Sequence, residues 1–310
     1  MKRLSAGLFL SFLVLNGCAQ KTKAKPVKGP DNENTLLWKI SGNGLEKPSY
    51  LFGTIHMLCK DDAGISENLK NSIINADEVY FEIDLDNMLE MLTVMSKMKM
   101  KGDTTLQDLL SKEDYEKVKN YFDGAGSMLP FSMLETYKPI LAASLLEQSS
   151  LPCDKNTAME QEIMEVAKKY KKKIKGLETM GYQAEVLDGI PYKMQAEQLV
   201  AYIDNANKGK DSSSTELSEM LQAYREQDLN KLEALMMKEE AGVAAYADIL
   251  LFQRNRNWIE KLKEILPGHS LLIAVGAGHL PGEKGVLNLL RKAGFTVTPV
   301  ENKVITTKEI

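Results

Sequence analysis

Two of the three histidines in this chain stand in the same local setting. His56 ends the apolar run Tyr50–His56 (YLFGTIH), and His279 ends the apolar run Leu271–His279 (LLIAVGAGH). Each run closes in a Gly-x-x-His pattern, in which glycine lets the chain leave a strand sharply and lets a ligand approach the backbone. Imidazole is a common metal ligand and titrates near neutral pH. We therefore predict that both histidines contribute to one site, which is formed by two parts of the chain that lie far apart in the sequence.

Acidic residues are predicted at the ends of two further strands. Residues 78–84 alternate between polar and apolar types and carry Glu82, and a short strand ends at Glu178. In an open α/β sheet, ligands bind outside the carboxyl ends of the strands. Both glutamates are thus expected at the same edge of the sheet as the two histidines.

These side chains match the ligands of a divalent metal. Two neutral imidazoles and one carboxylate, from His56, His279 and Glu82, leave coordination positions open for water. A metal held in this way acidifies its water and polarises a carbonyl group, which is the chemistry of hydrolysis. Two roles stay open for Glu82, as the third ligand or as the base that takes the proton from the water. Asp84 and Asp86 lie close enough in the sequence to replace it.

Glu178 and Arg254 are predicted to support the reaction. Arg254 could orient a substrate carboxylate or stabilise an oxyanion, and it could equally be the buried partner of Glu178. The sequence leaves these two roles of Arg254 open. Gln183 is expected to have a supporting role as well.

A second interpretation of Leu271–His279 is a nucleotide-binding turn. Its glycines, the following apolar helix and a last strand before Glu301 resemble the βαβ dinucleotide fingerprint. Its spacing, Gly-x-Gly-x-x-x-Gly, departs from that fingerprint, Glu283 stands near the phosphate position, and few residues follow Val300. This interpretation also leaves His56 unexplained, so we prefer the shared histidine site.

The elements that must position these residues indicate an α/β fold. Their predicted order is strands at 36–40 and 49–53, a helix at 69–76, a strand at 78–84, a mostly helical region, a strand at 270–275, a helix at 284–293 and a strand at 295–300. The first strand–helix–strand succession implies a right-handed crossover and a parallel pair. We predict a mixed, mostly parallel sheet flanked by helices, with a large helical insertion at about 86–268 between its halves.

Four methionines, Met88, Met91, Met95 and Met98, recur at helical spacing in the predicted insertion. Such a stripe can form a soft-metal site or an adaptable surface for an apolar ligand, but it most often packs in a core. We therefore predict that these methionines are buried.

The first residues are predicted not to belong to the fold. Two basic residues precede an apolar segment that ends just before Cys18, the pattern of a bacterial lipoprotein signal in which Cys18 becomes a lipidated N-terminus. Residues 1–17 would be the signal peptide, 18–34 a tether, and 35–310 a single domain. An uncleaved signal anchor is the alternative. The predicted location is the bacterial cell envelope, where the lipid-anchored protein faces the periplasm or the cell surface.

Charge and cysteine content agree with this location. The formal net charge is −4, and loss of the two positive charges of Lys2 and Arg3 with the signal would make it −6. A nucleic-acid partner is therefore not expected. Once Cys18 carries lipid, Cys59 and Cys153 remain as an even pair outside the reducing cytosol. We predict a disulfide between them, with two separate buried thiols as the alternative.

Taken together, these motifs resemble the TraB/GumN family, which includes the Tiki proteins. The resemblance covers residues 36–300 and rests on Gly53-Thr54-Ile55-His56, Phe81-Glu82, Gly176-Leu177-Glu178 with Gln183, Arg254-Asn255 with Trp258, and Ala274-Val275-Gly276-Ala277-Gly278-His279-Leu280. It implies a mixed-sheet α/β fold and a metal-dependent protease, with manganese or cobalt supporting activity in the Tiki branch. The site residues it implies are His56, His279 and Glu82. Many members have Asp where this chain has Glu160.

The predicted function is a metal-dependent hydrolase, foremost a peptidase, that acts on a peptide or protein with manganese, cobalt or zinc as its cofactor. The alternative is a non-catalytic envelope protein that binds haem, a metal or a peptide signal in the same cleft. A Soret band in the absorption spectrum of the purified protein would favour haem binding over hydrolysis.

Overall fold

A six-stranded sheet organises the fold, in the order β6 (Lys173–Glu178), β4 (Glu78–Ile83), β7 (Leu271–Gly276), β2 (Ser49–Thr54), β1 (Leu37–Ser41) and β8 (Thr296–Val300). Strands β6, β4, β7 and β2 run parallel to one another, and β1 is antiparallel to both of its neighbours. The predicted mixed, mostly parallel α/β fold is confirmed.

The computed structural model describes residues 34–124, 130–149, 151, 153–207, 212–238 and 243–304. The predicted signal peptide, the lipidation site Cys18 and all but the last residue of the predicted tether lie outside the described residues. Within the described ranges, no helix combines the length and the apolar character needed to cross a bilayer.

Helices fill most of the chain between the strands. They are α1 (Glu67–Asn75), α2 (Met88–Lys97), α3 (Leu106–Leu109), α4 (Lys112–Gly124), α5 (Phe131–Leu134), α6 (Pro139–Ser149), α7 (Met159–Lys169), α8 (Met180–Val186), α9 (Tyr192–Asn207), α10 (Ser212–Arg225), α11 (Leu229–Met236), α12 (Val243–Ala247), α13 (Gln253–Ile265) and α14 (Val286–Lys292). The sequence predicts one helix from residue 241 to 266, but a π-helical turn at Asp248–Phe252 separates α12 from α13.

The strand order brings the predicted site residues together. The sequence predicts β2 and β4 as a direct parallel pair, and this is wrong, because β7 lies between them. Nothing in the local sequence of residues 49–83 indicates that a strand from the far end of the chain lies between these two strands. The correction strengthens the site, since the carboxyl ends of the adjacent strands β2, β7, β4 and β6 lead to His56, His279, Glu82 and Glu178.

The same order argues against the nucleotide-binding interpretation. In a βαβ dinucleotide unit the two strands lie next to each other in the sheet, with the phosphate at the first turn. Here β7 pairs with β2 and β4, whereas β8 lies at the far edge of the sheet beside β1. The glycine turn after β7 instead faces a carboxylate, because Gly276 N donates to Glu82 Oε1 at 2.9 Å.

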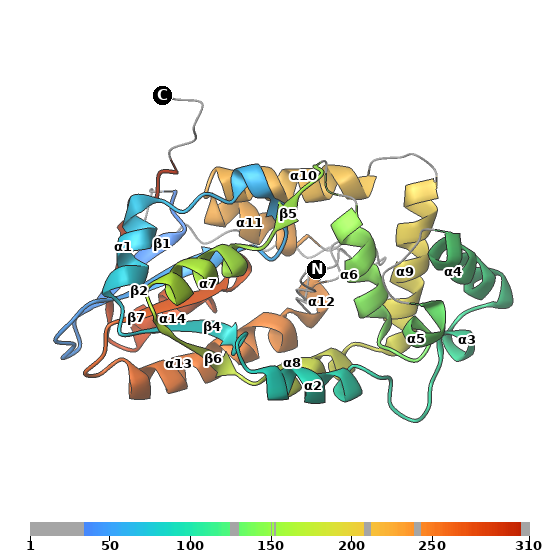
Figure 1. The fold of residues 1–310 in the computed structure, drawn as a ribbon, viewed down its shortest axis with the longest axis horizontal. Coiled ribbons are helices and arrows are strands. Elements are labelled where there is room, and N and C mark those ends of the chain that lie inside the picture. Colours follow the sequence, from blue (N-terminus) through green and yellow to red (C-terminus); the bar gives the residue numbers. More distant parts are fainter. Residues whose placement is uncertain are drawn as a thin grey trace.

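Two buried clusters stabilise the fold. One surrounds the sheet and includes Phe52, Phe81 and Trp258, and the other joins the helices on the far side, around Leu106 and Leu251. Figure 1 shows the sheet at one end of the molecule and the helices α3 to α6 and α9 at the other, beyond the ends of β4 and β6. The predicted site therefore lies at the carboxyl ends of the strands, on the side of the sheet that faces these helices.

The predicted disulfide between Cys59 and Cys153 is present, with their Cα atoms 5.9 Å apart. A small second sheet that the sequence does not indicate, β3 (Leu58–Cys59) against β5 (Asn156–Thr157), lies at the same place. The bond and the sheet together join the segment after His56 to the segment before α7. Closing a loop of this length is expected to add about 2–5 kcal/mol to the free energy of unfolding.

The methionine stripe is buried only in part. Met98 is 3% exposed, as predicted, and Met91 and Met95 pack partly against the helical cluster. Met88 is 64% exposed, so the prediction is wrong for this residue. Met88 is the first residue of α2, so it stands at the very end of the stripe.

Candidate functional site

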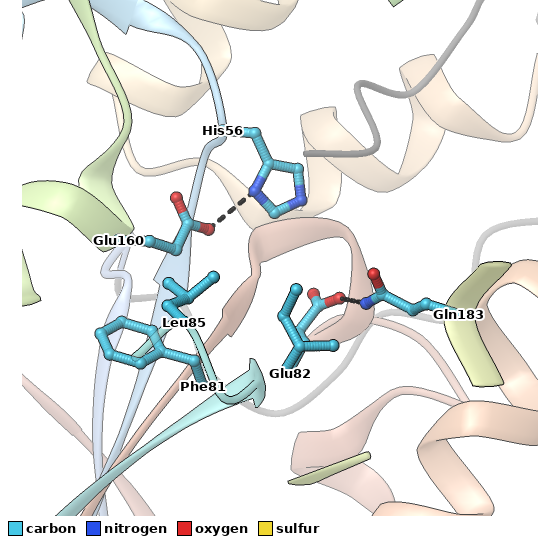
Figure 2. Close-up of a pocket in the computed structure, with 7 residues that line it drawn as sticks. His56, Phe81, Glu82, Leu85, Glu160 and Gln183 are labelled. Atoms are coloured by element: carbon cyan, nitrogen blue, oxygen red, sulfur yellow. Dashed lines mark hydrogen bonds and ion pairs between the residues drawn. The ribbon is translucent and has the colours of Figure 1, made fainter. Parts of the chain in front are cut away.

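The start of α7 holds Glu160 against His56. Met159 N donates to Ile55 O (3.1 Å), which ties the first turn of α7 to the first Gly-x-x-His loop. Glu160 is 3% exposed, and its Oε1 lies 2.8 Å from His56 Nδ1. Figure 2 shows this pair among the residues that line a small pocket. The Cys59–Cys153 disulfide joins the same two segments a few residues away. It therefore helps to hold Glu160 against His56.

Helix α13 holds the second histidine. His279 follows β7 in a short 3₁₀ turn and its side chain is fully buried. Its Nδ1 lies 2.6 Å from Asn255 Oδ1, while Asn255 Nδ2 donates to the carbonyl oxygens of His279 (3.3 Å) and Lys284 (2.9 Å). An amide oxygen only accepts hydrogen bonds. His279 Nδ1 therefore carries the proton, and Nε2 carries the lone pair.

Glu82 contacts the turn that carries the second histidine. Its Oε1 accepts from Gly276 N (2.9 Å) and lies 3.7 Å from His279 Nε2. Its Oε2 accepts from Gln183 Nε2 (2.9 Å) and Arg254 Nη2 (2.5 Å). Figure 2 shows Glu82 and Gln183 on the side of the pocket opposite Glu160. The carboxylate is thus held on both oxygens.

Arg254 links Glu82 to Glu178 inside the protein. The residue is 4% exposed, and its guanidinium donates to Glu178 Oε1 from Nε (2.9 Å) and from Nη2 (2.6 Å). Trp258 Nε1 donates to the other oxygen of Glu178 (2.9 Å). Of the two roles left open for Arg254, the structure shows the second, because the guanidinium is the buried partner of Glu178.

The three predicted ligands converge around Gly276. A Cβ atom placed on Gly276 would lie 3.2 Å from Glu82 Oε1, 3.6 Å from His279 Cδ2 and 3.9 Å from His56 Nε2. The backbone there does not need a positive φ (−49°). Even a methyl group here would be tight against the Glu82 carboxylate and in ordinary contact with both histidines, so a larger side chain would enter the space between these three residues.

Burial and neighbouring charges shift the titration of the site. Burial alone would lower the pKa of His56, but the Glu160 carboxylate and the charge of Glu82 outweigh it and raise this pKa to about 9. Burial, together with the charge of Arg254, lowers the pKa of His279 to about 3. Burial opposes ionisation of Glu82, yet Arg254 and the two histidines hold its pKa well below the usual range. Near neutral pH, Glu82 is a carboxylate and His279 a neutral imidazole.

The donor set fits a divalent metal in its chemistry. Metal-binding histidines usually direct their other ring nitrogen to an oxygen, as His56 does with Glu160 and His279 with Asn255. Neither oxygen of Glu160 makes a well-aligned hydrogen bond within the described part of the chain. In the positions seen here, no three His, Cys, Asp or Glu side chains of the described residues are grouped closely enough to hold an ion.

Other residues considered from the sequence lie elsewhere. Asp84 Oδ1 accepts from Asp86 N (3.0 Å), Asp86 pairs with Lys168 (2.7 Å) at the surface, and neither aspartate lines the pocket that Glu82 lines. The sequence does not identify Asn255 as a site residue. It belongs to the same motif as Arg254, but only the packing of α13 against the turn at His279 reveals its contact.

The contact between His56 and Glu160 is expected to make stability depend on pH. The pKa of His56 rises from 6.5 to about 9 on folding, so the pair stabilises the fold fully below about pH 6.5 and loses this effect as the pH rises through about 9. The effect is at most about 3 kcal/mol. Thermal melting of the wild type and Glu160→Gln should differ most near pH 6 and least near pH 10. An equal difference at both pH values would contradict the assignment.

Comparison with known families gives a match over most of the chain. The family model described as the TraB/PrgY/gumN family matches residues 36–299. No solved structure matches the chain.

Several curated proteins are similar to the chain at low identity. Metalloprotease TIKI2 of Danio rerio is 23% identical over 91% of this chain, and Metalloprotease TIKI1 of Homo sapiens is 22% identical over 85%. The chain spans 64% and 61% of these two relatives, less than two thirds of their length. The uncharacterised protein YbaP of Escherichia coli K12 is 23% identical over 78% of this chain and 87% of its own length.

Proposed function

The chain belongs to the TraB/PrgY/gumN family, and we propose that it is a metal-dependent hydrolase that cleaves a peptide or protein. The observation that carries the proposal is the pair of histidines that follow the adjacent strands β2 and β7. Each has its Nδ1 against a side-chain oxygen and its ring beside Gly276 and the Glu82 carboxylate. The metalloprotease relatives support a divalent metal and a peptide or protein substrate.

His56, His279 and Glu82 are the proposed ligands, and manganese, cobalt or zinc is the proposed ion, because imidazole and carboxylate together suit borderline divalent cations. A cation in this place would acidify its bound water and polarise a substrate carbonyl. The lowered pKa of Glu82 favours the ligand role over the role of base, since a carboxylate that stays ionised is a weak proton acceptor. His56 must lose its proton before it can serve as a ligand.

Glu160 is the proposed proton acceptor. It lines the pocket beside His56, and its second carboxylate oxygen has no hydrogen-bond partner among the described residues. The same pocket is lined by Phe81, Ile83 and Leu85.

The envelope location and the lipid anchor at Cys18 are proposed from the sequence alone. The basic start, the short apolar segment and the cysteine that follows it support them. Mass spectrometry of protein isolated from membranes tests the anchor. A mature N-terminus at Cys18 with attached acyl chains is the expected result, and an unmodified N-terminus at Met1 would exclude it.

Cleavage of a peptide library, with and without a chelator, tests the proposed activity. Products that vanish with chelator and return with manganese, cobalt or zinc are expected, and they should be missing in His279→Ala. Products that are insensitive to chelator would exclude metal-dependent hydrolysis. The absence of any product, together with bound metal or a Soret band, would favour the alternative of a non-catalytic binding protein.

A further inference from the structure

Arg254 uses the whole hydrogen-bonding capacity of its side chain inside the site. A guanidinium has five N–H donors and no acceptor. Nε and Nη2 reach the carboxylates of Glu178 and Glu82, and Nη1 donates to Leu250 O at 2.9 Å and contacts His279 Nε2 at 3.2 Å. The carbonyl of Leu250 belongs to the π-helical turn that precedes α13.

The contact with His279 occupies a particular lone pair. Because Arg254 can only donate, His279 Nε2 is the acceptor in this contact. Asn255 independently fixes the proton of His279 on Nδ1. Nε2 is the nitrogen of His279 that would bind the proposed metal, and Glu82 is the carboxylate that both the metal and Arg254 would contact. Arg254 therefore places a positive charge against two of the three proposed ligands.

We infer that Arg254 is an internal counter-cation that competes with the metal for Glu82 and His279. The inference rests on the proposed metal site. When the metal binds, the guanidinium gives up its contact with His279 Nε2 and part of its interaction with Glu82. Two of its donors remain on Glu178, which Trp258 holds from the other side. Glu178 thus acts through Arg254, as the alternative partner that draws the guanidinium away from the ligands.

The sign of a change in metal affinity separates this role from a supporting one. If Arg254 only oriented Glu82 for the metal, its removal would weaken metal binding. If it competes, its removal takes a positive charge and a blocking donor away from the site. Arg254→Met should then bind Mn²⁺ or Zn²⁺ at least about tenfold more tightly than the wild type, since charges a few ångströms apart interact strongly in a buried site.

Competition with a chromogenic chelator at pH 8 measures these affinities for the wild type, Arg254→Met, Arg254→Lys and Arg256→Met. Arg256 is the matched control, because it lies on the same helix and is half exposed, with Asp248 as its partner. Arg254→Lys keeps the charge but has fewer donors, so a smaller gain in metal affinity is expected. If Arg254→Met does not fold, Arg254→Lys is the variant that tests the inference. The control should match the wild type.

Glu178→Gln should change the metal affinity in the opposite direction. With this carboxylate neutralised, Arg254 stays with Glu82 and metal binding should weaken. In a protein that already carries Arg254→Met or Arg254→Lys, the same change should have a smaller effect or none. An equal effect in both backgrounds would show that Glu178 does not act through Arg254.

Unchanged or weaker metal binding in the folded Arg254 variants overturns the inference but leaves the metal site intact, provided that His279→Ala abolishes binding. Metal binding that appears only in the Arg254 variants supports the inference strongly. Absence of metal binding in the wild type and in every Arg254 variant overturns both the inference and the proposed function.

Discussion

Replacing either His56 or His279 by alanine is expected to lower the affinity for a divalent metal by at least about a hundredfold, more than the loss typical for residues that only support a ligand. Each substitution removes one of two imidazoles that converge beside Gly276. Equilibrium dialysis followed by elemental analysis measures the bound metal per chain. Any chelator-sensitive peptidase activity should disappear with it.

The third histidine is the matched control for this experiment. His269 is exposed and lies in the turn before β7, away from the pocket. His269→Ala should therefore keep the metal content of the wild type. Equal loss in all three variants would indicate general destabilisation, and unchanged metal content in His56→Ala and His279→Ala would contradict a shared site.

Glu82→Gln is expected to remove metal binding and activity together. A ligand role requires the charged carboxylate, and its lowered pKa indicates that the surroundings are built for that charge. The substitution also leaves Arg254 with one buried carboxylate partner, so a moderate loss of stability should accompany the loss of metal. Isothermal titration with the metal and thermal melting measure the two effects separately.

A matched control for this change is Glu185→Gln on helix α8, where the carboxylate is exposed and pairs with Lys97 (2.7 Å). It should leave metal affinity unaltered. If Glu82→Gln retains tight metal binding but is inactive, Glu82 is the base and not a ligand, and the role proposed for Glu160 would be wrong.

The sequence predicts the strand ends well because their signals are local. Alternation over residues 78–84 locates β4 and Glu82, and the apolar runs that close in Gly-x-x-His locate β2 and β7. Each of these patterns is contained within about one element. Parallel strands with their ends at one edge follow from general rules of α/β folds.

The supporting contacts of the site were beyond such signals. Asn255 and Glu160 reach the histidines from helices α13 and α7, and their approach depends on how distant segments pack. The insertion of β7 between β2 and β4 is equally non-local. Arg254 shows the same limit. The sequence permits a substrate-binding role for it, and only the structure shows that it pairs with two buried carboxylates.

Anomalous diffraction at the zinc edge, from crystals of the full chain soaked in zinc, tests most directly whether His56 and His279 bind the same ion. The account predicts a single strong peak that lies about 2.0–2.1 Å from the Nε2 atoms of both histidines. It also predicts that the Arg254 guanidinium no longer contacts His279. A peak bonded to only one of the two histidines, or to neither, would contradict the shared site.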